Sequence, residues 1–248
     1  MNSIFLLCTL ALFNGKDLSG WYKYLSGLGR DNDPKNVISV TNGVIRITGE
    51  SWGALVTEGE YENYRLTVEY RWLGTRLGAK AQKALDSGIL FHSTGPDGAF
   101  YGTWMASHEF NLVQGATGDF WTVHPKGSDM YLKAEASDTL LDGKFRIWEK
   151  GGTPVTLTGN DRLCRFDISP AWDNKPTTPL TAEERPTGEW NTAVLECRGE
   201  TVRAYLNGKL VNEALSVKPS KGRIQLQSEG CGIEFRRVTL EPLTRSPR

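Results

Sequence analysis

The sequence predicts an all-β protein, an antiparallel jelly-roll or related β-sandwich. Three observations favour this fold class. Apolar and polar residues alternate with period two along much of the chain, turn residues recur roughly every 8–12 residues, and the 248 residues include 27 glycines. Segments with helical patterning are scarce. A chain of this length buries a large core as one domain and does not depend on disulfides to fold.

Two hairpins are the clearest local signals. Asn42-Gly43 separates two alternating segments within residues 37–48, and Asn207-Gly208 separates two more within residues 202–212. Both residues of an Asn-Gly pair tolerate the positive φ that a tight two-residue hairpin turn requires. We therefore expect an antiparallel strand pair at each place.

Further strands are predicted by alternation alone. Within residues 65–72, one face of the predicted strand carries Leu66, Val68, Tyr70 and Trp72. The apolar spacing of the last segment slips at Arg236-Arg237, which predicts a β-bulge there. The predicted strand segments are residues 65–72, 88–93, 108–114, 223–228 and 233–240.

Less regular segments complete a single domain over residues 12–243, with 244–248 as a tail. Residues 76–86 are rich in helix-forming residues and form either a short helix or the tip of a loop. Thr181–Arg185 carries a helix-capping pattern and predicts one helical turn. Around residues 161–188, abundant Pro, Thr and Asp predict a long surface loop.

The N-terminal residues 1–11 leave two alternatives open. The apolar run Ile4–Phe13 is too short to span a bilayer. It is either the remnant of a signal peptide, although no basic residue precedes it, or a buried first strand. The four cysteines have no metal-ligand spacing, so we expect buried free thiols.

Charge and missing motifs exclude several classes of function. The 29 basic and 29 acidic residues give no net charge, so nothing favours binding to a nucleic acid. The sequence contains no GxSxG nucleophile elbow, P-loop, GxGxxG fingerprint or HExxH zinc motif. We therefore expect no organic cofactor.

Several motifs, taken together, resemble those of the 3-keto-disaccharide hydrolase family. The opening LFNGKDLSGW begins at Leu12, SGILFH (87–92) is followed by HEFNLVQGATGDF (108–120), and the C-terminal motif GRIQLQSEGCGIEF begins at Gly222. The resemblance implies a concanavalin A-like lectin/glucanase fold and cleavage of glycosides oxidised at C3 of the sugar ring. It also implies a separate oxidoreductase that supplies the keto sugar, and export from a bacterial cell to the periplasm or beyond.

The implied chemistry defines what the site must contain. A ketone at C3 acidifies the C2–H bond, so a base can form an enolate that expels the C1 substituent, and water can then add back. This route needs a base, a cation or hydrogen-bond donor for the enolate oxygen, and an acid for the leaving group. Direct hydrolysis stays open as an alternative. A non-catalytic carbohydrate-binding module or lectin is the alternative from another class of function.

Glu109 and His92 are the predicted catalytic residues. In the family pattern an acidic residue is followed two positions later by an amide, here Glu109 and Asn111, although Asn is shorter than the usual Gln. His92 ends the SGILFH segment and is a candidate base, donor or ligand. A divalent metal bound by histidine and glutamate side chains near His108 also stays open.

The predicted substrate-binding residues have structural alternatives. Glu69 and Arg71 share a strand face, where they either contact the sugar or form a surface ion pair. Gln227 faces away from the core residue Leu226, whereas the direction of Glu229 is open. The indole rings of Trp104, Trp121 and Trp172 either stack on sugar rings or fill the core.

Overall fold

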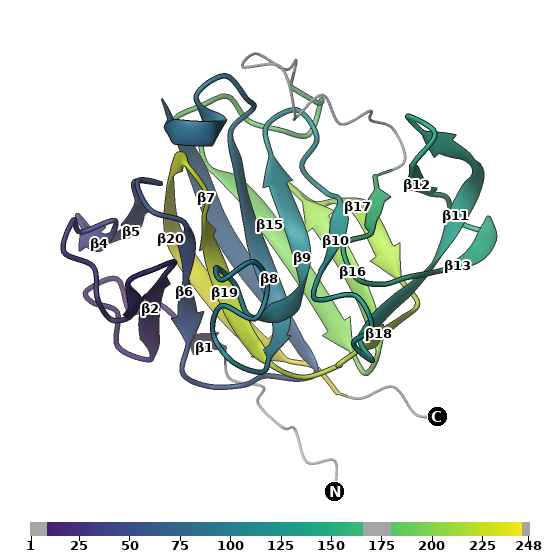
Figure 1. The fold of residues 1–248 in the computed structure, drawn as a ribbon, viewed down its shortest axis with the longest axis horizontal. Coiled ribbons are helices and arrows are strands. Elements are labelled where there is room, and N and C mark those ends of the chain that lie inside the picture. Colours follow the sequence, from purple (N-terminus) through teal and green to yellow (C-terminus); the bar gives the residue numbers. More distant parts are fainter. Residues whose placement is uncertain (1–8, 166–179, 245–248) are drawn as a thin grey trace, which may run out of the picture.

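The computed structural model describes residues 9–165 and 180–244, and it confirms the predicted all-β fold. Two large β-sheets stack face to face (Figure 1). The described residues contain a single short helix, the 3-10 turn η1 (Gly78–Lys80). No helix in these two ranges is long and apolar enough to cross a membrane.

One sheet has eight strands in the order β17-β16-β15-β7-β20-β5-β4, with β1 paired to β20. Its strands are β1 (Leu10–Ala11), β4 (Ile38–Thr41), β5 (Val44–Ile47), β7 (Tyr64–Arg76), β15 (Asn191–Arg198), β16 (Thr201–Leu206), β17 (Lys209–Ala214) and β20 (Cys231–Pro242).

The other sheet has twelve strands in the order β13-β11-β12-β14-β10-β9-β8-β19-β6-β2-β3, with β18 paired to β11. All its pairs are antiparallel except β12 with β14. Its strands are β2 (Trp21–Leu25), β3 (Gly29–Arg30), β6 (Gly53–Thr57), β8 (Asp86–Thr94), β9 (Ala106–Val113), β10 (Phe120–Val123), β11 (Tyr131–Leu141), β12 (Phe145–Trp148), β13 (Thr153–Leu157), β14 (Arg162–Cys164), β18 (Ser216–Lys218) and β19 (Arg223–Ser228).

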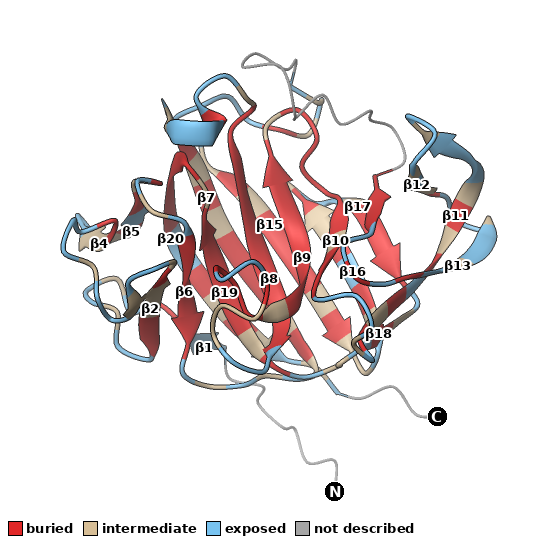
Figure 2. Cartoon of the chain, viewed as in Figure 1, coloured by how far each residue is buried: buried red, intermediate tan, exposed pale blue. Residues whose placement is uncertain are grey.

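The main hydrophobic core fills the space between the two sheets, and the central strands are buried along most of their length (Figure 2). The predicted inward face of β7 contributes to it, because Leu66, Val68, Tyr70 and Trp72 are all at most 2% exposed. Phe91, Phe110 and Phe120 meet them from the other sheet. Each fully buried side chain of this size stabilises the fold by roughly 1.5–3 kcal/mol.

Both predicted hairpins are present. Asn42 and Gly43 adopt φ values of 52° and 77° between β4 and β5, and Asn207 and Gly208 adopt 47° and 89° between β16 and β17. These are the left-handed conformations that a two-residue Asn-Gly hairpin turn requires. The predicted bulge is also present, because the register of β20 against β7 shifts between Phe235 and Arg237.

The irregular segments differ in detail from the prediction. Between the end of β7 at Arg76 and the start of β8 at Asp86 lies the short 3-10 helix η1. Thr181–Arg185 forms a turn rather than a helical turn, closed by a hydrogen bond of 3.1 Å from Glu184 N to Thr181 O. The predicted loop at 161–188 contains β14, and residues 166–179, with Trp172, lie outside the described residues. Cys164, Cys197 and Cys231 are free and buried, as expected.

Candidate active site

A second face of the twelve-stranded sheet, pointing away from the core, carries a pocket of about 170 Å³. Alternation along β9 sends Phe110 and Leu112 into the core and turns Glu109 and Asn111 outward. A smaller apolar cluster that includes Leu90 and Trp104 covers this outer face. The pocket is lined by Trp52, Lys80, Asp86, Phe100, Tyr101, Trp104, Glu109, Asn111, Trp121, Val123, Asn160, Gln227 and Glu229.

Glu109 lies at the floor of the pocket and is only 4% exposed. The neighbouring strand makes room for it at Gly88, where an added Cβ would overlap the carboxyl group, with Cδ of Glu109 only 2.7 Å away. Asn111 donates a hydrogen bond of 2.9 Å to Oε1 of Glu109. Burial and the nearby charge of Glu229 raise the pKa of Glu109 to about 8, so this carboxyl group holds a proton at neutral pH.

Lys80 forms the charged centre of the pocket. Its ammonium group is buried and forms ion pairs with Asp86 and with Oε1 of Glu229, the latter at 2.8 Å. Burial alone would lower the pKa of Lys80, but the two carboxylates outweigh this effect and raise it, so the lysine stays charged. Burial and Asp86 raise the pKa of Glu229 to about 7. The pocket therefore holds a buried cation together with Glu109 and Glu229, two carboxyl groups whose raised pKa values of about 8 and about 7 lie near neutral pH.

Gln227 contributes an unsatisfied polar atom. Its side chain lines the pocket and is 2% exposed, and its Oε1 has no hydrogen-bond partner among the described residues. A buried polar atom without a partner costs about 1–3 kcal/mol, so it is normally paired with protein, water or ligand. A hydroxyl group of a bound sugar would supply this partner.

Aromatic side chains form the walls. The rings of Trp52 and Trp104 stack with centroids 5.8 Å apart, and Nε1 of Trp104 donates a hydrogen bond of 2.9 Å to the carbonyl oxygen of Gly53. Trp121 is fixed from the opposite wall by a hydrogen bond of 2.5 Å from its Nε1 to Asn160. Such amphipathic rings offer apolar faces to the C–H groups of a sugar.

The structure thus brings together five of the predicted site residues, listed here as Glu109, Asn111, Gln227, Trp104 and Trp121. It adds Lys80, Asp86 and Trp52, which the sequence patterns missed, and it gives Glu229 a direction. Lys80 lies within the aperiodic segment 76–86 and Asp86 ends it, and alternation says nothing about side-chain direction there. The one sequence feature that could have pointed to Lys80 as a pocket residue is its place in the loop that leads into SGILFH.

The structure does not bring His92 into the pocket, contrary to its predicted catalytic role. A bulge between Phe91 and Thr94 gives His92 a φ of 50°, which breaks the alternation. Its ring points into the core instead, with its centroid 5.8 Å from that of Tyr64 on the other sheet, and Nδ1 lies 3.0 Å from the carbonyl oxygen of Pro219. Burial lowers the pKa of His92 to about 4. His92 therefore packs in the core between the two sheets and does not line the pocket.

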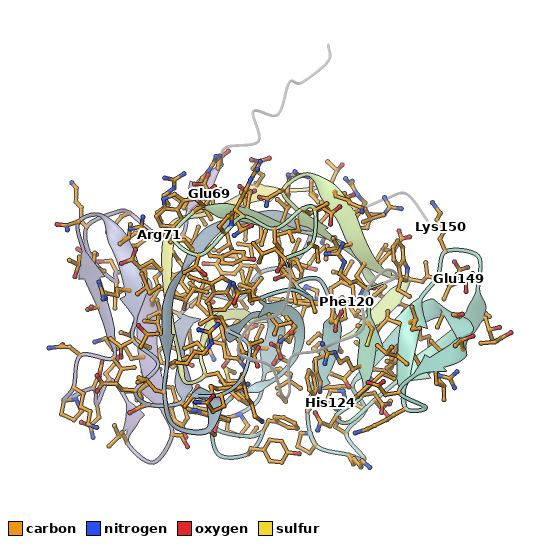
Figure 3. The ribbon with its side chains drawn as sticks, turned by 90° about the horizontal axis from the view of Figure 1, so that it is seen from above. Glu69, Arg71, Phe120, His124, Glu149 and Lys150 are labelled. Atoms are coloured by element: carbon orange, nitrogen blue, oxygen red, sulfur yellow. The ribbon has the colours of Figure 1, made fainter. Side chains whose placement is uncertain are left out.

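Glu69 and Arg71 also lie outside the pocket, on the outer face of the eight-stranded sheet. Figure 3 shows both at one side of the molecule and His124, which directly follows β10, at the other, with the core residue Phe120 between them. Arg71 donates a hydrogen bond of 2.8 Å to Glu234, and Glu69 accepts one of 2.5 Å from Arg236. These contacts match the ion-pair alternative rather than sugar binding.

The described residues contain no group of three or more His, Cys, Asp or Glu side chains arranged to hold a metal ion. His108 lies on the core side of β9, with Nε2 3.1 Å from the carbonyl oxygen of Lys218, so it does not share a face with Glu109. The pocket carboxylates Asp86 and Glu229 are instead bound to a lysine. The residues near His92 and His108 therefore do not fit the divalent metal site that the sequence left open.

Comparison with known proteins identifies the family. The family model described as the 3-keto-alpha-glucoside-1,2-lyase-like domain matches residues 9–241. The chain belongs to this family. The match to a 3-keto-alpha-glucoside-1,2-lyase-like domain agrees with the resemblance carried by the sequence motifs, and it spans both sheets and every residue of the pocket. The chain matches no curated protein.

Several solved structures share the fold of this chain. Two proteins of Parabacteroides distasonis ATCC 8503, both assigned as glycosyl hydrolases, match with TM-scores of 0.54 and 0.51 at 20% and 18% identity. The alignments cover 95% of this chain in each case and 94% and 100% of the other chains.

An endo-β-galactosidase of Clostridium perfringens that releases GlcNAcα1-4Gal matches with a TM-score of 0.51 at 8% identity. The alignment covers 94% of this chain and 61% of that enzyme. At these identities the likeness establishes a jelly-roll fold of the kind found in glycanases.

Proposed function

We propose that this protein cleaves glycosides whose sugar ring carries a ketone at C3. The observation that carries the proposal is the buried Lys80 ammonium group, paired with Asp86 and Glu229 beside the protonated Glu109, in a pocket with tryptophan walls. This set supplies a cation, a base and an acid within one site. Membership of the 3-keto-alpha-glucoside-1,2-lyase-like family supports the choice of a keto sugar as substrate.

In the proposed reaction each group has one role. The Glu229 carboxylate takes the proton from C2, and the electron pair of the C2–H bond moves onto the C3 carbonyl as an enolate, which the Lys80 ammonium group stabilises. The enolate reforms the ketone as a C1=C2 double bond forms and the C1–O bond breaks. Glu109 gives its proton to the departing oxygen, so the leaving group departs as a neutral alcohol.

Water completes net hydrolysis. The proton held by Glu229 exchanges with solvent before this step. The oxygen of water then adds to C1, Glu229 gives its exchanged proton to C2, and the remaining proton of water restores Glu109. The products are then a 3-keto sugar and an alcohol, with no net oxidation or reduction. Because no oxidation step occurs, the ketone must be introduced earlier by a separate oxidoreductase. Asn111 orients the Glu109 carboxyl group, and Gln227 accepts a hydrogen bond from a sugar hydroxyl.

Carbohydrate binding without catalysis is the second candidate, because the stacked Trp52 and Trp104 rings would hold a sugar without any acid or base. The buried ion pairs favour the enzyme. A binding module gains nothing from burying Lys80 with two carboxylates, since taking charges out of water is costly. Export to the periplasm or the cell exterior stays a prediction from the family resemblance.

The test compares 3-keto-trehalose with trehalose as substrates of the purified protein. We expect release of 3-keto-glucose and glucose from the first, no cleavage of the second, and loss of turnover in the Glu109→Gln variant. Binding of both sugars without turnover would favour the binding module. Cleavage of unoxidised trehalose at a similar rate would indicate a conventional glycosidase, which needs two carboxyl groups across the bond but no ketone.

A further inference from the structure

The pocket continues into a groove along one half of the twelve-stranded sheet. Two further cavities, of about 570 Å³ and 460 Å³, share Asn160 with the pocket, and the first also shares Tyr101. Both are bordered by Lys144 and Asp161. We call these two cavities the groove. The pocket of about 170 Å³ is smaller than the roughly 300–1,000 Å³ of sites for larger ligands, so it holds one sugar ring and a second unit extends into the groove.

The groove carries basic side chains that the protein itself does not neutralise. Lys126 borders its first cavity, Arg146 borders the second, and Lys144 borders both. All three are exposed, and none forms an ion pair with a residue of the described ranges. Lys144 only approaches the ring of Phe145, at 4.8 Å from its centroid.

The other charged groups that line the groove do not cancel these cations. Arg162 is paired with Asp119, which lies outside the groove. Asp161 is the one carboxylate among the residues that line the two cavities, and its Oδ2 accepts a hydrogen bond of 2.9 Å from the backbone N–H of Thr158. His124 is buried, and burial lowers its pKa, so it is neutral at pH 7. The groove is therefore positive, although the whole chain has no net charge.

We propose that the groove binds the leaving half of the substrate and that this half is an anionic sugar, bearing a carboxylate or a sulfate. This inference rests on the proposed function, because it takes the pocket as the site of the keto-sugar ring. Tyr101, 74% exposed at the boundary of the pocket and the groove, offers a ring face to the second sugar. The three cations would attract its negative group, which favours an anionic unit over a neutral one, and would repel a cationic unit.

Binding of unoxidised disaccharides tests the charge preference without requiring turnover. The probes are glucosyl-glucose, glucosyl-glucuronate and the 6-sulfate of glucosyl-glucose, titrated calorimetrically at low and high salt. We expect at least one anionic probe to bind roughly fivefold more tightly than the neutral one at low salt, with a smaller ratio at high salt. The two anionic probes distinguish a carboxylate from a sulfate. Equal affinity for all three would overturn the inference.

Two double variants test whether the preference for an anionic disaccharide arises in the groove. Lys126→Gln/Lys144→Gln removes two of the three groove cations and should clearly weaken the preference for the anionic sugar. Lys16→Gln/Lys35→Gln removes the same charge from exposed lysines that border neither cavity and should preserve the preference. A preference that is unchanged in the first pair contradicts the groove. The two proposals also fail separately. If 3-keto-trehalose is cleaved without any charge preference, only the groove inference fails; if the preference exists without cleavage, only the proposed reaction fails.

Discussion

Gly88 and Glu109 lie on neighbouring strands, β8 and β9. The carboxyl group of Glu109 occupies the space that a side chain at position 88 would fill. Gly88 has no positive φ to explain its presence, so its role is steric. The glycine of the SGILFH motif thereby positions the acidic group of the HEFN motif. The two motifs are separated in sequence and meet only in the sheet.

We predict that Gly88→Ala lowers activity with little effect on stability. The new Cβ would push the Glu109 carboxyl group out of its place, and a displacement of about 1 Å at a reacting group can cost 10²-fold in rate. Strand β8 should persist, because alanine is compatible with its extended backbone. Cleavage kinetics and thermal unfolding measure the two effects.

A second change checks that the effect of Gly88→Ala acts through Glu109. Glu109→Asp in the same chain shortens the side chain by one CH₂ group and relieves the overlap, so the double variant should lose less than the product of the two single effects. Strict multiplicativity of the two losses would argue against steric positioning of Glu109 by Gly88.

The Glu109→Gln variant should lose roughly 10²–10⁴-fold in kcat, because it removes general acid catalysis but keeps the shape of the side chain. The matched control is the Glu69→Gln variant. Glu69 lies on the outer face of the eight-stranded sheet, away from the pocket, so we expect an unchanged kcat. Binding of the substrate should survive in both variants. An equal loss of kcat in the control would contradict the assignment of the active site to this sheet.

Much of the fold could be predicted from the sequence, because turns and alternation are local properties. The Asn-Gly hairpins and the bulge at Arg236-Arg237 are specified by residues that lie beside one another in the chain. Alternation also identified the outward face of Glu69 and Arg71 correctly. It could not say on which sheet that face would lie, since strand order depends on contacts between distant segments.

The candidate site was less predictable for two physical reasons. At His92 a single residue with positive φ reverses the alternation, and nothing in the residue type announces it. At Lys80 a buried cation depends on Asp86 and on Glu229, which is far away in sequence. Lysine is rarely buried without such partners, so its pocket position emerges only from the three-dimensional arrangement.

We predict that Lys80→Met destabilises the fold by about 3–5 kcal/mol, because it leaves two buried carboxylates without their cation. The loss should grow as pH rises, since the unpaired carboxyl groups can take up protons only at lower pH. Urea unfolding at several pH values measures it. Lys218→Met provides the control: it removes the ion pair with Asp129, in which both side chains are exposed, and we expect little change in the free energy of unfolding.

The dependence of kcat/KM on pH should be bell-shaped. Glu229 must be deprotonated to act as a base, so activity rises as pH increases through about 7, its raised pKa. Glu109 must keep its proton to act as an acid, so activity falls as pH increases through about 8. The two limbs belong to the interacting pair of groups. A profile that is flat between pH 5 and 10 would contradict both roles.

The most direct test of the account follows the hydrogen at C2. A 3-keto-glycoside carrying deuterium at C2 is cleaved in ordinary water, and the 3-keto sugar that is released is examined by NMR at the first turnovers, with the free sugar incubated alone to correct for spontaneous exchange. The account predicts that the product loses deuterium at C2 and that the labelled substrate reacts more slowly. Cleavage with deuterium fully retained at C2 and no isotope effect would contradict proton abstraction as the step that breaks the glycosidic bond.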